Sequence, residues 1–393
     1  MGGKFNVVIV RVGGEIWIKK DWTRRWYLRR LARNIKAVLQ YHDVAYSNMI
    51  RRDGRIFLRT SEPLEAAERI SRVFGVSSVS AALETEAELN MIVKECLSLA
   101  GRMLSKGDAF AVKCRRVGEH PYTSQEVCRV VGRKVLEEFA ARRVSVDLDN
   151  PDVRLGVEVR GELGFVFSDV IGGVGGFPLG VQGRVVGLLS GGLDSAVACW
   201  LVMKRGCLVA PLYLDCAPFT DESTTERAIE VARVLSNWAI GFPGRLHMVK
   251  YGKSLKEIVE GAPRRLTCIL CKRMMYRVAE RIADKVGAEG LVTGEAIGEQ
   301  ASQTLQNLRV LDRAAVSYPV LRPLLGFDKA ETERLARKIG TYAVSARSVG
   351  GCDAVPYKPA TKAKLEEVVE AENGLNIEKM VERCARELVV VDL

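Results

Sequence analysis

A glycine-rich segment, SGGLDS at residues 190–195, is the first part of this chain whose residue types could do chemistry. It follows the apolar run 184–189 and precedes a run typical of a helix. Glycines let the backbone approach a ligand closely, and successive N–H groups at a helix N-terminus attract anions. Ser190 and Ser195 add hydroxyl donors, whereas the carboxylate of Asp194 beside phosphates indicates bound Mg²⁺ or a helix cap. The segment lacks the G-x-x-x-x-G-K-[ST] spacing, so it is not a Walker loop.

Cysteine is the second residue type that points to chemistry. Only Cys268 and Cys271, out of ten cysteines, have the C-x-x-C spacing of metal ligands. A redox dithiol or a structural role are alternatives. A zinc site would need four ligands, and neither a fourth cysteine nor one of the three histidines is well placed for it. Seven cysteines without paired spacing are expected to be small core residues: Cys96, Cys114, Cys128, Cys199, Cys207, Cys216 and Cys384.

Length and composition bound the kind of molecule that carries these motifs. A chain of 393 residues, 48% apolar and 27% charged, should fold into two or three globular domains. No apolar run reaches the roughly 18–20 residues needed to cross a bilayer. The start, MGGKFNVVIV, is too short and too soon followed by charge to be a secretory signal. We therefore expect a cytoplasmic protein with no membrane partner.

The net charge of +11 is concentrated at the start of the chain. Residues 1–78 contain 16 basic and 7 acidic residues, whereas residues 79–172 contain 13 and 15. A basic segment of this kind favours a polyanionic partner, with nucleic acid ahead of membrane. A solvated surface tuned for solubility would show the same excess.

Hydrophobic periodicity divides the chain into three parts. Strands at 5–11 and 55–59 and helices around 28–38 and 62–73 indicate a small α+β unit. A second unit has helices at 86–105 and 124–141 and strands at 110–116, 152–160 and 164–168. Residues 171–183 contain six glycines and one proline, as in a flexible connector or an irregular loop. The last part alternates strands at 184–189, 208–214, 246–250 and 290–293 with helices at 194–205, from 224, and at 271–286, which predicts a doubly wound parallel sheet.

An ordered set of motifs gives the chain a family resemblance. SGGLDS after a buried strand resembles the PP-loop of ATP pyrophosphatases. With CKRMMY at 271–276, TGEAIG at 293–298, ASQTLQNL at 301–308, LRPL at 321–324 and GCD at 351–353, nearly the whole chain resembles the tRNA 4-thiouridine synthetases. Two departures are Ala196 where that family often has proline and Glu299 where it usually has glutamine, and Glu299 makes a substrate-holding role for that position doubtful.

The resemblance implies a ferredoxin-like domain at 1–78, a THUMP RNA-binding domain at 79–170 and a PP-loop domain at 171–393. It further implies ATP and Mg²⁺ as cofactors, tRNA as partner, a homodimer as one common arrangement, and Asp194 as the residue that organises Mg²⁺ or the loop. The residues it places at ATP are Leu188, Leu189, Ser190, Gly191, Gly192, Ser195, Tyr213, Leu214, Lys272, Gly294 and Gln303.

Sulfur is the remaining requirement of the implied reaction. Cys352 matches a catalytic cysteine of the family, and about 40 residues follow it, too few for the rhodanese-like domain of bacterial members. Archaeal members hold an iron–sulfur cluster with three cysteines, which here would be Cys268, Cys271 and Cys352. Three thiolates on a 4Fe–4S cluster leave one iron free for sulfide, and a 3Fe–4S form would need the same ligands.

The expected reaction is adenylation of a tRNA uridine, at position 8 in this family, followed by attack of sulfide or a Cys352 persulfide at C4. A sulfide or persulfide donor is then a further partner. The sequence leaves two other functions open. The protein could be a PP-loop enzyme that makes a 2-thio nucleoside, or an RNA-binding protein whose loop only senses nucleotide.

Overall fold

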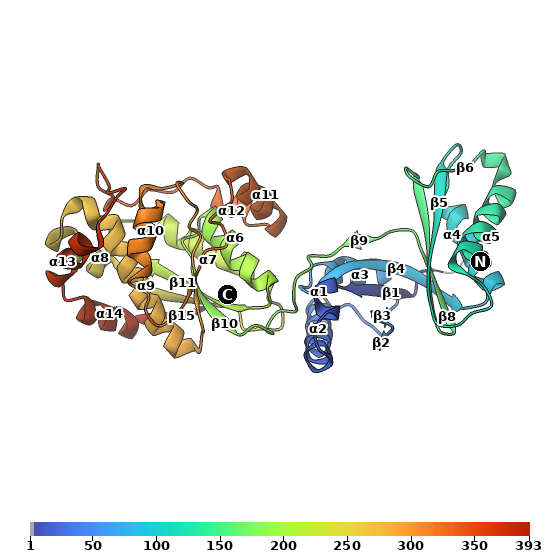
Figure 1. The fold of residues 1–393 in the computed structure, drawn as a ribbon, viewed down its shortest axis with the longest axis horizontal. Helices are drawn as coiled ribbons and strands as arrows, with labels where there is room; N and C mark the ends of the chain where they lie inside the picture. The colour runs from blue at the N-terminus through green and yellow to red at the C-terminus, as the bar shows by residue number, and fades with distance from the viewer. Residues whose placement is uncertain (1–3) are drawn as a thin grey trace. The chain divides into compact units, whose positions relative to one another are not determined.

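The computed structural model describes residues 4–393 and divides into two compact units, Met1–Pro178 and Leu179–Leu393 (Figure 1). Each unit has its own sheet and its own helices. We describe the units separately.

Unit 1 is built on one sheet with strand order β2-β3-β1-β4-β8-β7-β5-β6, with β9 paired to β4. Helix α3 packs against β1 and β4, with α2 beside it. Helices α4 and α5 pack together, α4 against β7 and β8 and α5 against β5. The strands are β1 Val7–Val12, β2 Asn48–Arg52, β3 Arg55–Arg59, β4 Val76–Glu86, β5 Ala109–Val117, β6 Ser145–Val146, β7 Val153–Arg160, β8 Leu163–Phe167 and β9 Ile171–Gly172. The helices are α1 Gly14–Trp17, α2 Asp21–Tyr41, α3 Pro63–Ser71, α4 Leu89–Met103 and α5 Ser124–Glu138.

Strand β4 joins the two halves of unit 1. Its residues 76–82 pair with β1, and its residues 83–86 pair with β8. The boundary expected between residues 78 and 79 lies within this strand. β4 was not predicted, because Ser77-Ser78-Val79-Ser80 interrupts the apolar alternation that marks a half-buried strand.

A buried carboxylate links the two halves of unit 1. Glu158 on β7 is 1% exposed and accepts hydrogen bonds from Arg11 (2.8 Å), Arg55 (3.2 Å) and Arg160 (2.9 Å). Burial alone would raise the pKa of Glu158, but the three guanidinium groups outweigh it and hold that pKa below its usual range. Because Arg11 and Arg55 come from β1 and β3, this cluster ties the first half of the sheet to the second.

Unit 2 is the predicted doubly wound sheet, in the order β14-β13-β10-β11-β12-β15. All its pairs are parallel except that of β12 with β15. The strands are β10 Arg184–Leu188, β11 Leu208–Asp215, β12 Arg245–Lys250, β13 Leu291–Val292, β14 Val320–Leu321 and β15 Leu388–Asp392. The helices are α6 Leu193–Lys204, α7 Glu222–Ser236, α8 Gly252–Gly261, α9 Thr267–Val286, α10 Leu305–Asp312, α11 Lys329–Ile339, α12 Tyr342–Ser345, α13 Leu365–Asn373 and α14 Ile377–Arg386.

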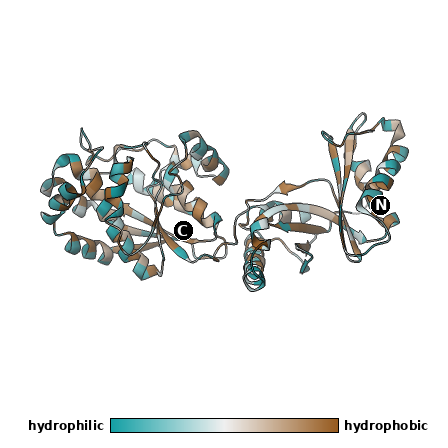
Figure 2. Cartoon of the chain, in the orientation of Figure 1, coloured by the Kyte–Doolittle hydropathy of each residue, from teal (hydrophilic) through white to brown (hydrophobic). Residues whose placement is uncertain are grey.

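Helices cover both faces of the sheet of unit 2. On one face, α6 and α7 pack together against β10–β12, and α11 packs against α6. On the other face, α9 and α14 pack together against the strands (Figure 1). The central strands are apolar and lie between helices whose outer surfaces are hydrophilic (Figure 2). Strands buried on both faces read as continuous apolar runs, which is why the sequence predicted them within a few residues.

Residues 171–177, the first part of the segment expected to be a flexible connector or an irregular loop, pack against unit 1. β9 pairs with β4, and the N–H of Gly173 donates to the carbonyl of Ser77 at 2.8 Å. Val174 and Phe177 are buried, and the Phe177 ring meets Tyr27 edge-on.

Within residues 4–393, no helix is both long and apolar enough to cross a membrane.

Candidate functional site: phosphate loop and thiols

The phosphate loop lies between the end of β10 and the start of α6. Ser195 organises it, since its Oγ accepts from the Ser190 N–H at 3.1 Å and donates to the Gly192 carbonyl at 3.1 Å. Ser190 Oγ in turn accepts from the Gly192 N–H at 3.3 Å. The first N–H groups of α6 have no partner inside the helix, so they face the loop as anion donors. The structure thus forms the loop predicted from SGGLDS.

Two glycines of this site are required by space. Gly191 has a φ of +76°, and a Cβ there would lie 2.9 Å from the Ala228 nitrogen on α7. Gly294 follows β13, and a Cβ there would lie 2.5 Å from the backbone of both Asp194 and Ser195. Backbone atoms cannot move aside as the end of a side chain can, so any larger residue would displace the loop. The role of Gly294 is therefore to bring the β13 segment against the first turn of α6.

Asp194 lies at the edge of the loop, in a cluster of charged side chains that also contains Lys329 and Glu299. Lys329, the first residue of α11, donates to both oxygens of Asp194 at 3.1 and 3.2 Å, and it also pairs with Glu299. Burial raises the pKa of Asp194, Lys329 opposes that rise, and Glu299 adds to it. Two carboxylates and one ammonium beside a phosphate loop can bind a divalent cation if the lysine moves to a phosphate.

Lys272 is fixed by a buried carboxylate, Glu295, which is 4% exposed. Glu295 accepts from Lys272 at 3.2 Å, Tyr276 at 2.6 Å and Arg322 at 2.7 Å. Burial alone would raise the pKa of Glu295, but Lys272, Tyr276 and Arg322 together lower it below its ordinary value. Glu295 follows Gly294 directly, so the lysine expected at ATP is connected to the phosphate loop through two adjacent residues.

Most of the other residues expected at ATP have buried side chains, so they would meet ATP through their backbone atoms. Leu189 donates its N–H to the Leu212 carbonyl, and its side chain is buried. Tyr213 and Leu214 are also buried, and the Tyr213 hydroxyl meets Thr225 at 3.1 Å. Leu188 packs against the core of unit 2. An adenine at this edge would therefore meet strand ends rather than an exposed aromatic face.

Gln303 has a buried polar atom that calls for a ligand or a water. It is 5% exposed, and its Oε1 has no hydrogen-bond partner among the residues that the structure describes. A buried acceptor without a partner is costly, so an N–H or hydroxyl group should reach it in the working protein. The exocyclic amine of adenine has that chemistry.

The three expected ligand cysteines come together at the start of α9. Cys268 and Cys271 lie in its first turns, and each is an electrostatic neighbour of Cys352 from the loop after α12. All three are free thiols. Burial, followed by the other thiols, raises the pKa of Cys271 to about 12 and raises that of Cys268 as well. Without a metal the two thiols of C-x-x-C therefore stay protonated at neutral pH.

The surroundings of two of these thiols are apolar. Cys271 and Cys352 pack against the core of unit 2, and thiolates are the ligands that soft metals and iron–sulfur clusters prefer. Across residues 4–393, no group of three or more His, Cys, Asp or Glu side chains is arranged to hold a metal ion.

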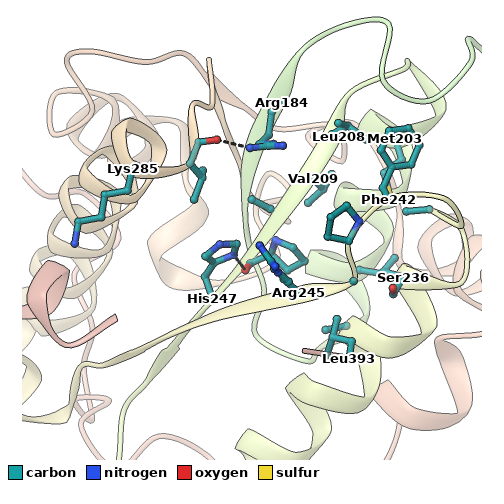
Figure 3. A pocket seen from close by; sticks show the side chains of 18 residues that line it. Arg184, Met203, Leu208, Val209, Ser236, Phe242, Arg245, His247, Lys285 and Leu393 are labelled. Atoms are coloured by element: carbon teal, nitrogen blue, oxygen red, sulfur yellow. Dashed lines mark hydrogen bonds between the residues drawn. The ribbon is translucent and has the colours of Figure 1, made fainter. Parts of the chain in front are cut away.

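A separate cavity of about 340 Å³ lies away from all these residues (Figure 3). It is lined by the first residues of the parallel strands, among them Arg184, Leu208 and Arg245, with His247 and Lys285 nearby. These are the amino ends of the strands, whereas ligands of doubly wound sheets bind at the carboxyl ends. We therefore assign the chemistry to the edge that carries the phosphate loop.

Comparison with known proteins agrees with this arrangement. Residues 180–377 match the family model described as thiamine biosynthesis protein (ThiI), residues 86–169 match the THUMP domain, and residues 7–80 match the ThiI ferredoxin-like domain. A probable tRNA sulfurtransferase of Methanosarcina mazei is 41% identical over 99% of this chain and 96% of its own length. The chain belongs to the tRNA sulfurtransferase family. A relative with the same name from Methanothermobacter thermautotrophicus is 40% identical over 97% of both chains.

Solved structures give the same assignment. A crystal structure of a 4-thiouridine synthetase–RNA complex with bound ATP has a TM-score of 0.88 and 33% identity, covering 99% of both chains. A protein of Pyrococcus horikoshii has a TM-score of 0.68 and 29% identity, covering 85% of this chain and 99% of its own. The expected fold, a ferredoxin-like and a THUMP module followed by a doubly wound PP-loop sheet, is confirmed for this tRNA sulfurtransferase.

The structure also adds residues to the site that the sequence analysis missed. Lys329, Glu295 and Arg322 are charged residues within or beside the quoted motifs, but nothing in their spacing shows which charges pair. Cys216, expected to be a small core residue, is buried in the hydrophobic core of unit 2, as predicted.

Proposed function

We propose that this tRNA sulfurtransferase uses ATP to convert a uridine of tRNA, at position 8, to 4-thiouridine. The observation that carries the proposal is the direct connection between the phosphate loop and the thiols. Cys271 precedes Lys272, Lys272 pairs with Glu295, and Glu295 follows Gly294, which packs on Asp194. A group that binds ATP and a group that handles sulfur therefore share one edge of one sheet.

The phosphate loop and its neighbours would bind the triphosphate. N–H groups of the loop and of the first turn of α6 that make no bond within the protein would meet the phosphate oxygens, and Lys272 would offset their charge. Asp194 would hold Mg²⁺ on the triphosphate, and Lys329 would leave the carboxylate for a phosphate oxygen as the metal enters. Gln303 Oε1 would accept a hydrogen bond from adenine.

Activation makes the uridine oxygen a good leaving group. O4 attacks the α-phosphorus, the bond to the β-phosphate oxygen breaks, and pyrophosphate leaves with its charge balanced by Mg²⁺, Lys272 and Lys329. Sulfur then attacks C4 and AMP departs with O4. The base must leave its stack to reach this edge, as in other enzymes that modify a base within a helical stem.

Cys268, Cys271 and Cys352 would supply the sulfur end of the reaction. An iron–sulfur cluster held by these thiolates would provide the sulfide that replaces O4. The residue after Cys352, Asp353, donates its N–H to the Phe219 carbonyl at 2.9 Å, which fixes this segment against the loop that follows β11. The external source of sulfur is a sulfide or persulfide donor.

Unit 1 would hold the body of the tRNA. Its first 78 residues carry a net charge of +9, and its shared β4 strand and Glu158 cluster make it one platform. Contacts to phosphates and shape should make binding depend strongly on salt. We place the reaction in the cytoplasm, and a homodimer stays a prediction from the family resemblance.

An anaerobic assay tests the proposal. The purified protein is given ATP, Mg²⁺, sulfide and unmodified tRNA, and 4-thiouridine is followed by its near-ultraviolet absorbance while pyrophosphate is measured separately. We expect both products in equal amounts. Cys352→Ala should release pyrophosphate without forming 4-thiouridine, and Cys199→Ala, a buried cysteine on α6, should behave like the unchanged protein.

Two results would reject the proposal in different ways. Formation of a 2-thio nucleoside would change the substrate position but keep the chemistry. Binding of ATP and tRNA by an iron-loaded protein, with no pyrophosphate and no thiolated base, would indicate an RNA-binding protein that senses nucleotide. Equal product from Cys352→Ala would remove Cys352 from the sulfur step.

A further inference from the structure

The segment around Cys352, residues 347–353, is called the sulfur loop here, and it is held by one face of helix α7. The carbonyl of Arg347 accepts a hydrogen bond from Arg227 Nη1 at 3.1 Å, and the Arg347 guanidinium pairs with Glu230 at 2.7 Å. Arg227 and Glu230 are three residues apart on α7, so they share a face of the helix. The first residue of the sulfur loop is therefore bound twice, once through its backbone and once through its side chain.

The middle of the sulfur loop has few side chains of its own to fix it. Gly350 and Gly351 directly precede Cys352. Gly350 lies against Asp221, the N-cap of α7, where a Cβ would be 2.7 Å from the carboxylate. The position of Cys352 therefore depends on the contacts that α7 makes with the residues before it.

The same helix contacts the phosphate loop. A Cβ at Gly191 would lie 2.9 Å from the Ala228 nitrogen and 3.2 Å from the carbonyl carbon of Arg227. Two residues earlier on α7, Thr225 meets the hydroxyl of Tyr213, a residue expected at ATP, at 3.1 Å. Arg227 thus belongs to the part of α7 that touches the expected nucleotide site, and its guanidinium holds the sulfur loop.

One nitrogen of the Arg227 guanidinium is left over. Its Nε is buried and has no hydrogen-bond partner among residues 4–393. Arginine stays protonated in proteins, so this N–H is a charged donor, and a buried donor without an acceptor is costly. Guanidinium groups bind phosphate oxygens especially well. A nucleotide at the phosphate loop would supply such an oxygen.

We propose that Arg227 joins the bound nucleotide to the sulfur loop: its Nε–H donates to a phosphate oxygen, while its Nη1 keeps the carbonyl of Arg347. Arg227 is then both a nucleotide-binding residue and a positioning residue for Cys352. This inference deepens the proposed function and rests on it, because it needs ATP at the phosphate loop and sulfur chemistry at Cys352. The sulfur loop is held best when nucleotide is present, which is when the sulfur step needs it.

ATP and the sulfur loop should stabilise each other through Arg227. The guanidinium loses its freedom once, when Nε binds a phosphate, so the hydrogen bond from Nη1 to Arg347 then costs less. Coupling of this kind is reciprocal, and it typically changes an equilibrium by about 5–150-fold. ATP should therefore slow amide hydrogen exchange in the sulfur loop by about fivefold or more, since exchange reports the opening of such a segment.

Two measurements without tRNA or a sulfur donor test the role of Arg227. Calorimetric titration gives the affinity for ATP with Mg²⁺, and mass spectrometry follows hydrogen exchange in peptides that contain the sulfur loop, with and without saturating ATP. Arg227→Met should weaken ATP binding by about tenfold, as expected for one hydrogen bond to a charged group. It should also abolish the slowing of exchange by ATP, because the connection is gone.

Three further variants serve as comparisons. Arg233→Met removes an exposed arginine from the same helix and should behave like the unchanged protein. Glu230→Gln removes the exposed pair with Arg347 but leaves Arg227 in place, so ATP should still slow exchange. Arg227→Lys keeps the charge, but one compact ammonium cannot take the places of both Nε and Nη1. It should recover part of the ATP affinity and none of the effect on the sulfur loop.

The outcomes separate this inference from the proposed function. Full slowing by ATP in Arg227→Met would overturn the inference, because ATP would then act on the sulfur loop by another route, and so would an unchanged ATP affinity. An unchanged protein that binds ATP and makes 4-thiouridine, with no slowing of exchange by ATP, would reject the inference and keep the function. An unchanged protein that does not bind ATP would reject the proposed function, and this inference with it.

Discussion

Glu295→Gln is the substitution whose effect follows most directly from the structure. The side chain keeps its shape, but the charge that fixes Lys272 and Arg322 is lost. One oxygen of Glu295 accepts from Tyr276, Thr293 and Arg322, and the other accepts from Lys272. A glutamine can place its single oxygen either toward Tyr276, Thr293 and Arg322 or toward Lys272. Its NH₂ would then face either the Lys272 ammonium or the Arg322 guanidinium, donor against donor.

The magnitude follows from burial. Glu295 is 4% exposed, and the Arg322 side chain is 8% exposed, so water cannot easily replace the lost acceptor. Removing one partner of a buried ion pair costs about 3–5 kcal/mol. For a unit of this size, 1 kcal/mol lowers the unfolding temperature by roughly 2–4 °C, so we expect a loss of about 6–20 °C. The pKa of Glu295 is lowered in the folded protein, so this stabilisation is present at neutral pH and is lost as the pH falls through that lowered pKa.

Calorimetry and ATP kinetics measure the two consequences. Calorimetry should show the drop in the transition of unit 2, and the KM for ATP in pyrophosphate release should rise, since Lys272 is no longer held in place. A misplacement that costs about 1.4 kcal/mol raises it tenfold. Glu333→Gln, which removes an exposed i,i+4 pair with Arg337 at 3.9 Å, should change neither quantity by much. A Glu295→Gln protein with an unchanged unfolding temperature and unchanged KM would refute the reasoning.

Three further substitutions test other parts of the molecule. Lys329→Met should raise the pKa of Asp194 further, since Lys329 opposes its rise, so activity should be lost at a higher pH on the acid side of the profile; a profile that does not move would contradict the Asp194–Lys329 pairing. Gly294→Ala should weaken ATP binding by at least about tenfold in calorimetric titration, because its Cβ would lie 2.5 Å from the Asp194 backbone, while tRNA binding stays unchanged. Glu158→Gln should destabilise unit 1 by about 3–5 kcal/mol in denaturant unfolding and leave ATP binding intact; an unchanged unit 1 transition would mean that the three arginines do not depend on this carboxylate.

Local patterns in the sequence predicted the elements that carry the phosphate loop. β10 and β11 are continuous apolar runs, and SGGLDS begins just after β10 and runs into the first turn of α6, so both ends of the loop were marked. β4 was missed because its serines look like loop residues, and β15 because it lies far from its partner β12 in the sequence. Edge strands and strands shared between two modules depend on pairing over long separations, which a local pattern does not contain.

The same limit explains what could be predicted of the site. Lys272 and Gly294 were identified by motif, but only the structure explains why these residue types are needed. Glu295 holds the Lys272 ammonium in place, and the backbone at the start of α6 leaves no room for a side chain at Gly294. Lys329 has no distinctive neighbours in the sequence. It lies beside the loop because α11 begins there, where its ammonium pairs with Asp194.

The placement of Cys271 and Lys272 on one helix has a mechanistic consequence. In the proposed reaction the base is activated at O4 and sulfur then attacks the adjoining C4, so both steps must occur without release of the adenylated base, which water would hydrolyse. α9 begins with the thiols and continues with Lys272 and Tyr276, and Glu295 ties that helix to the segment that packs on the phosphate loop. A shift of α9 would therefore move the thiols and the phosphate-binding lysine together. For this reason Glu295→Gln should lower the yield of 4-thiouridine per pyrophosphate released as well as the affinity for ATP, whereas Gly294→Ala should lower both products in the same proportion.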